Sequence, residues 1–200
     1  MFIQVIQGRC NDPGRLRQLT EEWTETLGPS AEGWLGGTYG VTDDGEAVAV
    51  VRFESREAAE RNSARPEQGE WWQRMQGCID GEVSVHDCDD AMLFLDGGSD
   101  DAGFVQVIQG RIDDPERLRH VMERPMDALH EARPDIIGGT LAIEPDGWFV
   151  ETVCFRTEEE ARAGEQQDLP PELGDFAEAM AHVRDTRYLD LHRPWFASAR

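Results

Sequence analysis

The stretch FIQVIQGRCNDPGRLRQL, residues 2–19, returns as FVQVIQGRIDDPERLRHV at residues 104–121. The offset is 102 residues, and 12 of the 18 positions are identical. Chance does not preserve so many identities at one fixed offset. The chain is therefore an internal duplication, and each copy is expected to form one structural unit.

The duplication sets the expected domain organisation. The chain has 200 residues, of which 39% are hydrophobic, and this is enough for two domains of about 100 residues each. The segment DGGSDD at residues 96–101 has the composition of a flexible linker. We predict repeat 1 over residues 1–97, a linker over residues 98–102 and repeat 2 over residues 103–200.

The charge of the chain limits its partners. There are 41 acidic and 19 basic residues, all of the latter Arg, for a net charge of −22. Such a surface repels phosphate backbones and anionic lipids, so we expect neither nucleic-acid nor membrane partners. No apolar run approaches the roughly 20 residues of a membrane span, and we predict a soluble, cytoplasmic protein without a signal peptide.

The four cysteines do not suggest a metal site. Cys10, Cys78, Cys88 and Cys154 form no C-x-x-C pair and do not recur between the copies. We expect reduced, mostly buried thiols, and neither a disulfide nor a bound metal.

The first copy alternates strand and helix signals. Residues 2–9 read as a strand, and Asp12-Pro13 supplies an N-cap and a first helical residue. The helix should end near Gly28-Pro29. A hairpin with its turn at Asp44-Gly45 joins a strand that starts near residue 36 to one over residues 47–54. A second helical region starts near residue 55, breaks at Pro66 and resumes over residues 71–75, and a last strand covers residues 82–86.

The second copy repeats this order, with a last strand at residues 187–192 and a three-residue insertion near Pro170-Pro171. The order β-α-β-β-α-β predicts an α+β fold of two tandem ferredoxin-like repeats. The first strand is apolar on both sides, with Ile3 and Val5 on one and Phe2 and Ile6 on the other. Both faces of such a strand need a cover. We therefore predict that the two repeats pack sheet to sheet as a pseudo-dimer within one chain.

The sequence carries an ordered set of motifs: FIQVIQGR, DPxRLR, GGT before a hairpin, and VVRFES or TVCFRT before a second helix. This set resembles the dimeric α/β-barrel superfamily, and in particular its antibiotic-biosynthesis-monooxygenase-like (ABM-like) family. The resemblance covers the chain twice, as in a fused dimer. It implies a pocket between the sheet and the helices of each repeat.

The resemblance also points to positions of known chemistry. Quinone-forming members carry Asn, Trp and Tyr where this chain has Ala49, Phe53 and Ala59, or Glu151, Phe155 and Ala161. Haem-degrading members carry an Asn near the position of Gln7 or Gln109, and a Trp and a His in the second helical region. Here Trp71-Trp72 and His182 stand in different copies. The resemblance therefore implies neither complete site, and we predict no cofactor.

Large apolar side chains concentrate in the first copy. The offset partners of Trp23, Trp34 and Tyr39 are Pro125, Ile136 and Leu141. These aromatic residues could simply fill a core, but residues that do not recur are also candidates for a specialised ligand cavity. The candidate ligand-binding residues are Trp23, Trp34, Tyr39, Trp71, Trp72, Met75 and Gln7.

One imidazole is a candidate acid or base. His182, in AMAHV, is the candidate catalytic residue, and an exposed helical histidine without a role is the alternative. Two functions stay open: a cofactor-independent monooxygenase-like enzyme acting on a small hydrophobic or aromatic molecule, and a non-catalytic protein that binds such a molecule on the same fold.

Overall fold

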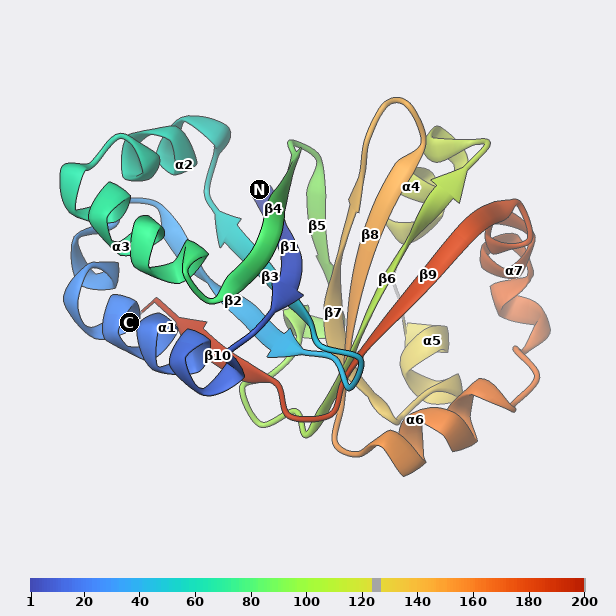
Figure 1. Ribbon diagram of the computed structural model, residues 1–200. Coiled ribbons are helices and arrows are strands. Elements are labelled where there is room, and N and C mark those ends of the chain that lie inside the picture. Colours follow the sequence, from blue (N-terminus) through green and yellow to red (C-terminus); the bar gives the residue numbers. More distant parts are fainter. Residues whose placement is uncertain (124–126, 200) are drawn as a thin grey trace. The chain divides into compact units, whose positions relative to one another are not determined.

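A computed structural model describes residues 1–123 and 127–199. The chain forms two compact units. Unit 1 contains Met1–Asp89 and the segment from Arg193 onward, and unit 2 contains Asp90–His192. Each unit is an antiparallel five-stranded sheet with helices on one face (Figure 1).

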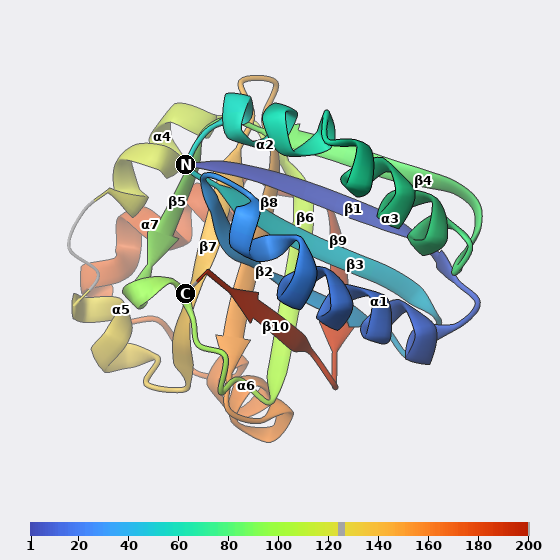
Figure 2. The same ribbon diagram turned by 90° about the vertical axis from the view of Figure 1, so that its left-hand side faces the viewer.

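Unit 1 has the sheet order β10-β2-β3-β1-β4. Figure 2 looks onto its helical side, where α1 and α3 lie in front of the sheet. Its elements are β1 (Phe2–Cys10), α1 (Pro13–Thr26), a 3-10 helix (Gly28–Ser30), β2 (Trp34–Val41), β3 (Glu46–Phe53), α2 (Arg56–Ser63), α3 (Pro66–Gln76), β4 (Ile79–Cys88) and β10 (Trp195–Ser198).

Unit 2 repeats this plan with the order β5-β7-β8-β6-β9. Its elements are β5 (Ala91–Phe94), a 3-10 helix (Leu95–Gly97), β6 (Phe104–Ile112), α4 (Pro115–Met122), α5 (Asp127–Ala132), β7 (Ile136–Ile143), β8 (Trp148–Phe155), α6 (Glu158–Glu165), a 3-10 helix (Pro171–Leu173), α7 (Gly174–Met180) and β9 (Val183–Leu191). Two tandem β-α-β-β-α-β repeats are thus present, and the predicted fold class is confirmed.

The first helix of each unit starts where its capping signal predicts. The Asp12 carboxylate accepts a hydrogen bond from the Arg15 amide at 2.9 Å, and the Asp114 carboxylate accepts one from the Arg117 amide at 3.0 Å. A proline follows each cap as the first helical residue. The caps satisfy amide groups that have no partner within the helix.

The fifth strand of each sheet is not predicted from the sequence. The end of the first copy forms β5, which pairs with β7 in unit 2, and the end of the second copy forms β10, which pairs with β2 in unit 1. The structural units therefore differ from the repeats at these two segments, residues 90–97 and 193–200. A four-residue strand carries little local signal, and only its distant partner defines it.

The core of each unit lies between the sheet and its helices. Phe2 and Phe53 belong to this core in unit 1, and Phe104 and Phe155 hold the same places in unit 2. On the other face of β1, Ile3 is also buried, with 0% of its surface exposed. The first strand is thus covered on both sides, as its apolar pattern predicts.

Candidate functional site

Unit 1 contains a cavity of about 320 Å³ between its sheet and its helices. This volume falls within the range of about 300–1,000 Å³ that is usual for small-ligand pockets. The lining residues come from four strands of the central sheet, from α1, α2 and α3, and from the last strand, β10.

Six of the seven predicted ligand-binding residues line this cavity. They are Gln7, Trp23, Tyr39, Trp71, Trp72 and Met75. Side chains alternate along a strand, so the Gln7 amide lies on the face opposite to Ile6, where it donates to Glu46 Oε1 at 3.4 Å. Trp34 is outside the lining. It packs edge-on against Trp23, with ring centroids 4.9 Å apart, in the core.

The indole N–H groups hold the helical wall of the cavity in place. Trp23 Nε1 on α1 donates to Gln68 Oε1 on α3 at 2.5 Å, and Trp71 Nε1 on α3 donates to the Leu19 carbonyl on α1 at 2.8 Å. These bonds satisfy polar groups that would be costly to bury alone. The two helices are thereby joined through the same aromatic residues that face the cavity.

Trp195, on the last strand, completes the lining, and sequence reasoning missed it. Trp195 pairs with Tyr39 across β10 and β2, and the two rings stack with centroids 6.4 Å apart and planes 12° from parallel. Both residues are buried and line the cavity. The one signal in the sequence is an aromatic pair, Trp195-Phe196, after the end of the repeat pattern.

The glycine pair before the hairpin makes room for Tyr39. A Cβ atom added to Gly37 would lie 2.4 Å from the Tyr39 hydroxyl oxygen, which is closer than any real contact. Gly36 has φ +135°, a conformation that L residues rarely adopt. The recurrent GGT motif therefore permits close approach of chain segments. In unit 1 it also leaves space for the Tyr39 ring to lie over Gly37.

No lining residue that the structure describes carries a charge. The polar ones are neutral: Gln4, Gln7, Thr20, Tyr39, Asn62, Ser63 and Gln68. Tyr39 is the one with a titratable hydroxyl, and burial raises its pKa above the ordinary value. At neutral pH its phenol stays protonated and can donate a hydrogen bond, but it cannot act as a base. The lining of the cavity is therefore uncharged and largely apolar.

Unit 2 fills the equivalent space differently. The strand registers place Phe149 at the position of Ala47, Leu141 at that of Tyr39 and Met92 at that of Trp195. Phe149 is fully buried, so a ring occupies the place where unit 1 has only a methyl group. Glu151 stands at the position of Ala49, which lines the cavity of unit 1.

His182 belongs to unit 2 and is not among the residues that line the cavity of unit 1. The helix α7 ends at Met180, and His182 is exposed in the turn that leads to β9 of unit 2. The residue is therefore not helical, and the catalytic role predicted for it stays a prediction. Pro125, the offset partner of Trp23, falls outside the described residues.

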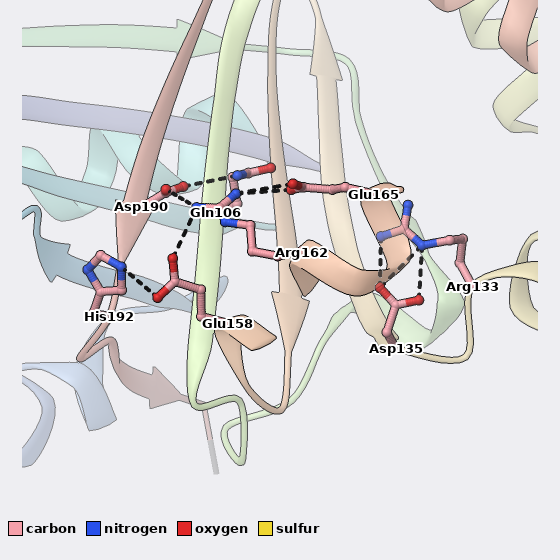
Figure 3. Close-up of polar contacts among 8 residues, drawn as sticks. All are labelled: Gln106, Arg133, Asp135, Glu158, Arg162, Glu165, Asp190 and His192. Atoms are coloured by element: carbon pink, nitrogen blue, oxygen red, sulfur yellow. Dashed lines mark hydrogen bonds and ion pairs between the residues drawn. The ribbon is translucent and has the colours of Figure 1, made fainter. Parts of the chain in front are cut away.

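A charged network joins α6 to the sheet of unit 2 (Figure 3). Arg162 pairs with Asp190 and Glu165, Asp190 accepts from Gln106 Nε2 at 3.0 Å, and Glu158 contacts His192 Nε2 at 3.1 Å. In unit 1, Arg56, Asp87 and Gln4 form a similar set, and in both units the guanidinium covers a phenylalanine ring. Because this arrangement of an arginine, an aspartate and a glutamine occurs in both units, we interpret it as structural.

Within residues 1–123 and 127–199, no group of three or more His, Cys, Asp or Glu side chains could hold a metal ion. None of the helices in these ranges combines the length and apolar character that a membrane crossing requires.

Comparison with known proteins identifies the fold. The chain is similar to a candidate monooxygenase of Lactobacillus acidophilus, with 15% identity, a TM-score of 0.77, and coverage of 99% of this chain and 96% of that one. A candidate monooxygenase of Fusobacterium nucleatum gives 8% identity, a TM-score of 0.75 and coverage of 98% and 94%. An anthrone oxidase-like protein gives 14% identity, a TM-score of 0.62 and coverage of 99% and 93%.

These similarities extend over both repeats. No family model matches the sequence, and no curated protein matches it. The chain has the same fold as the three solved structures above, a tandem of two ferredoxin-like repeats.

Proposed function

We propose that unit 1 binds a flat, uncharged aromatic molecule in the cavity between its sheet and its helices. The observation that carries this proposal is the cavity itself, about 320 Å³ in volume and lined by six aromatic side chains from α1, α3, β2, β3 and β10. Aromatic walls favour flat apolar ligands through stacking and surface burial. The neutral amides and the Tyr39 hydroxyl supply hydrogen bonds that would orient such a ligand.

Oxygenation of the bound molecule is the second candidate. It is supported by the similarity in fold, over both repeats, to candidate monooxygenases and to an anthrone oxidase-like protein. The positions that carry polar groups in quinone-forming relatives are Ala49, Phe53 and Ala59 here, and the first two line the cavity. No described lining group is a base at neutral pH. A substrate that is to be oxidised would therefore have to lose its proton without help from the cavity. Binding is therefore the function that the site supports best.

The test of binding uses a neutral fluorescent aromatic, N-phenyl-1-naphthylamine, whose emission rises in apolar surroundings. Trp72→Ala removes a wall of the cavity and should weaken binding at least about tenfold, or about 1.4 kcal/mol. Phe176→Ala is the matched control. Ile79 and Val183 hold equivalent positions in the pairing of the last strands with the first strands. Trp72 and Phe176 precede them by the same number of residues, so Phe176 is the unit 2 equivalent of Trp72. Equal losses from both changes would contradict the proposal.

A second variant tests the cavity without removing a wall. Ala47→Phe introduces the ring that unit 2 carries as Phe149, and it should abolish binding of the probe while the far-UV circular dichroism stays unchanged. For oxygenation, anthrone and O₂ would give anthraquinone and water, measured by an oxygen electrode. Probe binding without oxygen uptake above the uncatalysed rate would support the binding function and reject the oxygenase.

A further inference from the structure

The side chain of Glu151 is a feature of unit 2 that core packing does not explain. Glu151 lies in the middle of β8, between Ile108 on β6 and Leu141 on β7. Directly paired residues on antiparallel strands point to the same face, and Leu141 belongs to the core beneath the helices. Two residues away along the strand, Phe149 and Val153 also belong to that core. A carboxyl group therefore stands within an apolar layer.

This carboxyl group has no bonded partner among the residues that the structure describes. Burial raises its pKa, and the opposing influence comes from the Arg133 guanidinium. Arg133 is itself held by Asp135, through contacts of 2.7 and 2.9 Å (Figure 3). Arg133 therefore divides its charge between Asp135 and Glu151, and among the described residues no other cation acts on the Glu151 carboxylate. A carboxyl group in apolar surroundings needs an explanation, and a bound ligand can supply one.

The surroundings of Glu151 correspond to the cavity of the other unit. Ile108 pairs with Glu151 on one side and with Tyr188 on the other. The matching residues of unit 1 are Ile6, Ala49 and Val85, and all three line its cavity. As a whole residue, Glu151 is partly exposed.

Tyr188 adds an aromatic ring beside this position. It is 60% exposed, which is unusual for so large a ring, on the edge strand β9. Its backbone lies two strands from Glu151, or about 10 Å away. A ring at this distance can contact the body of a small ligand whose polar end reaches the carboxylate, and it can attract a cation through its π face.

We propose that unit 2 carries a second ligand site, in which the Glu151 carboxylate forms an ion pair with the ammonium group of a small hydrophobic amine. The ammonium supplies a further counter-ion, and the apolar side chains around Glu151 take the hydrocarbon part. The net charge of −22 raises the local concentration of organic cations and favours their approach. This site is independent of the cavity proposed in unit 1.

The experiment is calorimetric titration of the full-length Ala47→Phe variant, in which a phenyl ring occupies the cavity of unit 1, with 2-phenylethylamine at pH 7 and with 2-phenylethanol as the neutral counterpart. We expect saturable binding of the amine and at least tenfold weaker binding of the alcohol. Because the pKa of Glu151 is about 7, binding of the cation should release about half a proton, measured in buffers of different ionisation enthalpy.

Variants separate this site from nonspecific attraction of amines to an acidic surface. Glu151→Gln should abolish amine binding and the proton release, and Tyr188→Ala should weaken binding severalfold. Glu159→Gln, a change at an exposed position of α6, is the matched control for charge and should leave amine binding unchanged. Amine binding that persists in Glu151→Gln, equal binding of the alcohol, or no saturable heat up to about 10 mM amine would overturn the proposal.

Discussion

Replacing Glu151 with glutamine should stabilise the protein above neutral pH and leave it unchanged in acid. Burial raises the pKa of Glu151 from 4.5 to about 7. At about 1.4 kcal/mol per pH unit, this difference corresponds to about 3 kcal/mol against the ionised form. As a whole, the residue is partly exposed, which reduces the expected effect to about 2–3 kcal/mol.

The sign follows from where the protons are bound. Below about pH 4.5 the carboxyl is neutral in both the folded and the unfolded chain, so the folded state carries no penalty. Between about pH 4.5 and 7 the unfolded chain ionises first, and the free energy of unfolding falls as the pH rises. Above about pH 7 both states are ionised and the loss is complete. A glutamine side chain cannot ionise, so the Glu151→Gln variant avoids this loss.

The assay is urea unfolding of wild type, Glu151→Gln and Glu159→Gln, followed by far-UV circular dichroism at several pH values between about 5 and 8.5. The advantage of Glu151→Gln should be small near pH 5, grow toward pH 7 and then level off. Glu159→Gln should stay within about 0.5 kcal/mol of wild type throughout. Parallel pH profiles for wild type and Glu151→Gln would refute the reasoning.

Three further results are expected. Deleting residues 193–199 removes β10 and Trp195, and should abolish binding of N-phenyl-1-naphthylamine. The control Phe196→Ala should reduce this binding less. An intact affinity after the deletion would show that Trp195 is dispensable. Titration with hemin should give no saturable Soret shift, because His182 and the Trp71-Trp72 pair belong to different units, and a stoichiometric shift lost in His182→Ala would contradict this. Raising NaCl from about 0.05 to about 1 M should raise the unfolding temperature by several degrees, since salt screens the repulsion of a net charge of −22; a constant or falling temperature would mean that surface repulsion is unimportant.

The sequence by itself determined the repeated plan of the molecule. Each element of the β-α-β-β-α-β order carries a local signal: the Asp-Pro caps, the Asp-Gly turns and the alternating apolar residues of the first strand. These signals act over a few residues, so they can be read without knowledge of the fold. The absence of recurrence at Trp23 and Tyr39 is also visible in the sequence, and both residues line the cavity of unit 1.

Only the tertiary structure decided which distant residues meet. The pairing of β10 with β2 brings Trp195 onto Tyr39 across more than 150 positions of the chain, and no local pattern encodes such a contact. The sequence predicts Trp34 as a ligand contact, but its edge-on packing against Trp23 leaves it in the core. Glu151 is visible as a residue that differs between the copies, yet its chemistry depends on its apolar neighbours from β6 and β7. A carboxyl group takes its pKa from its surroundings in space, and these are assembled only when the chain folds.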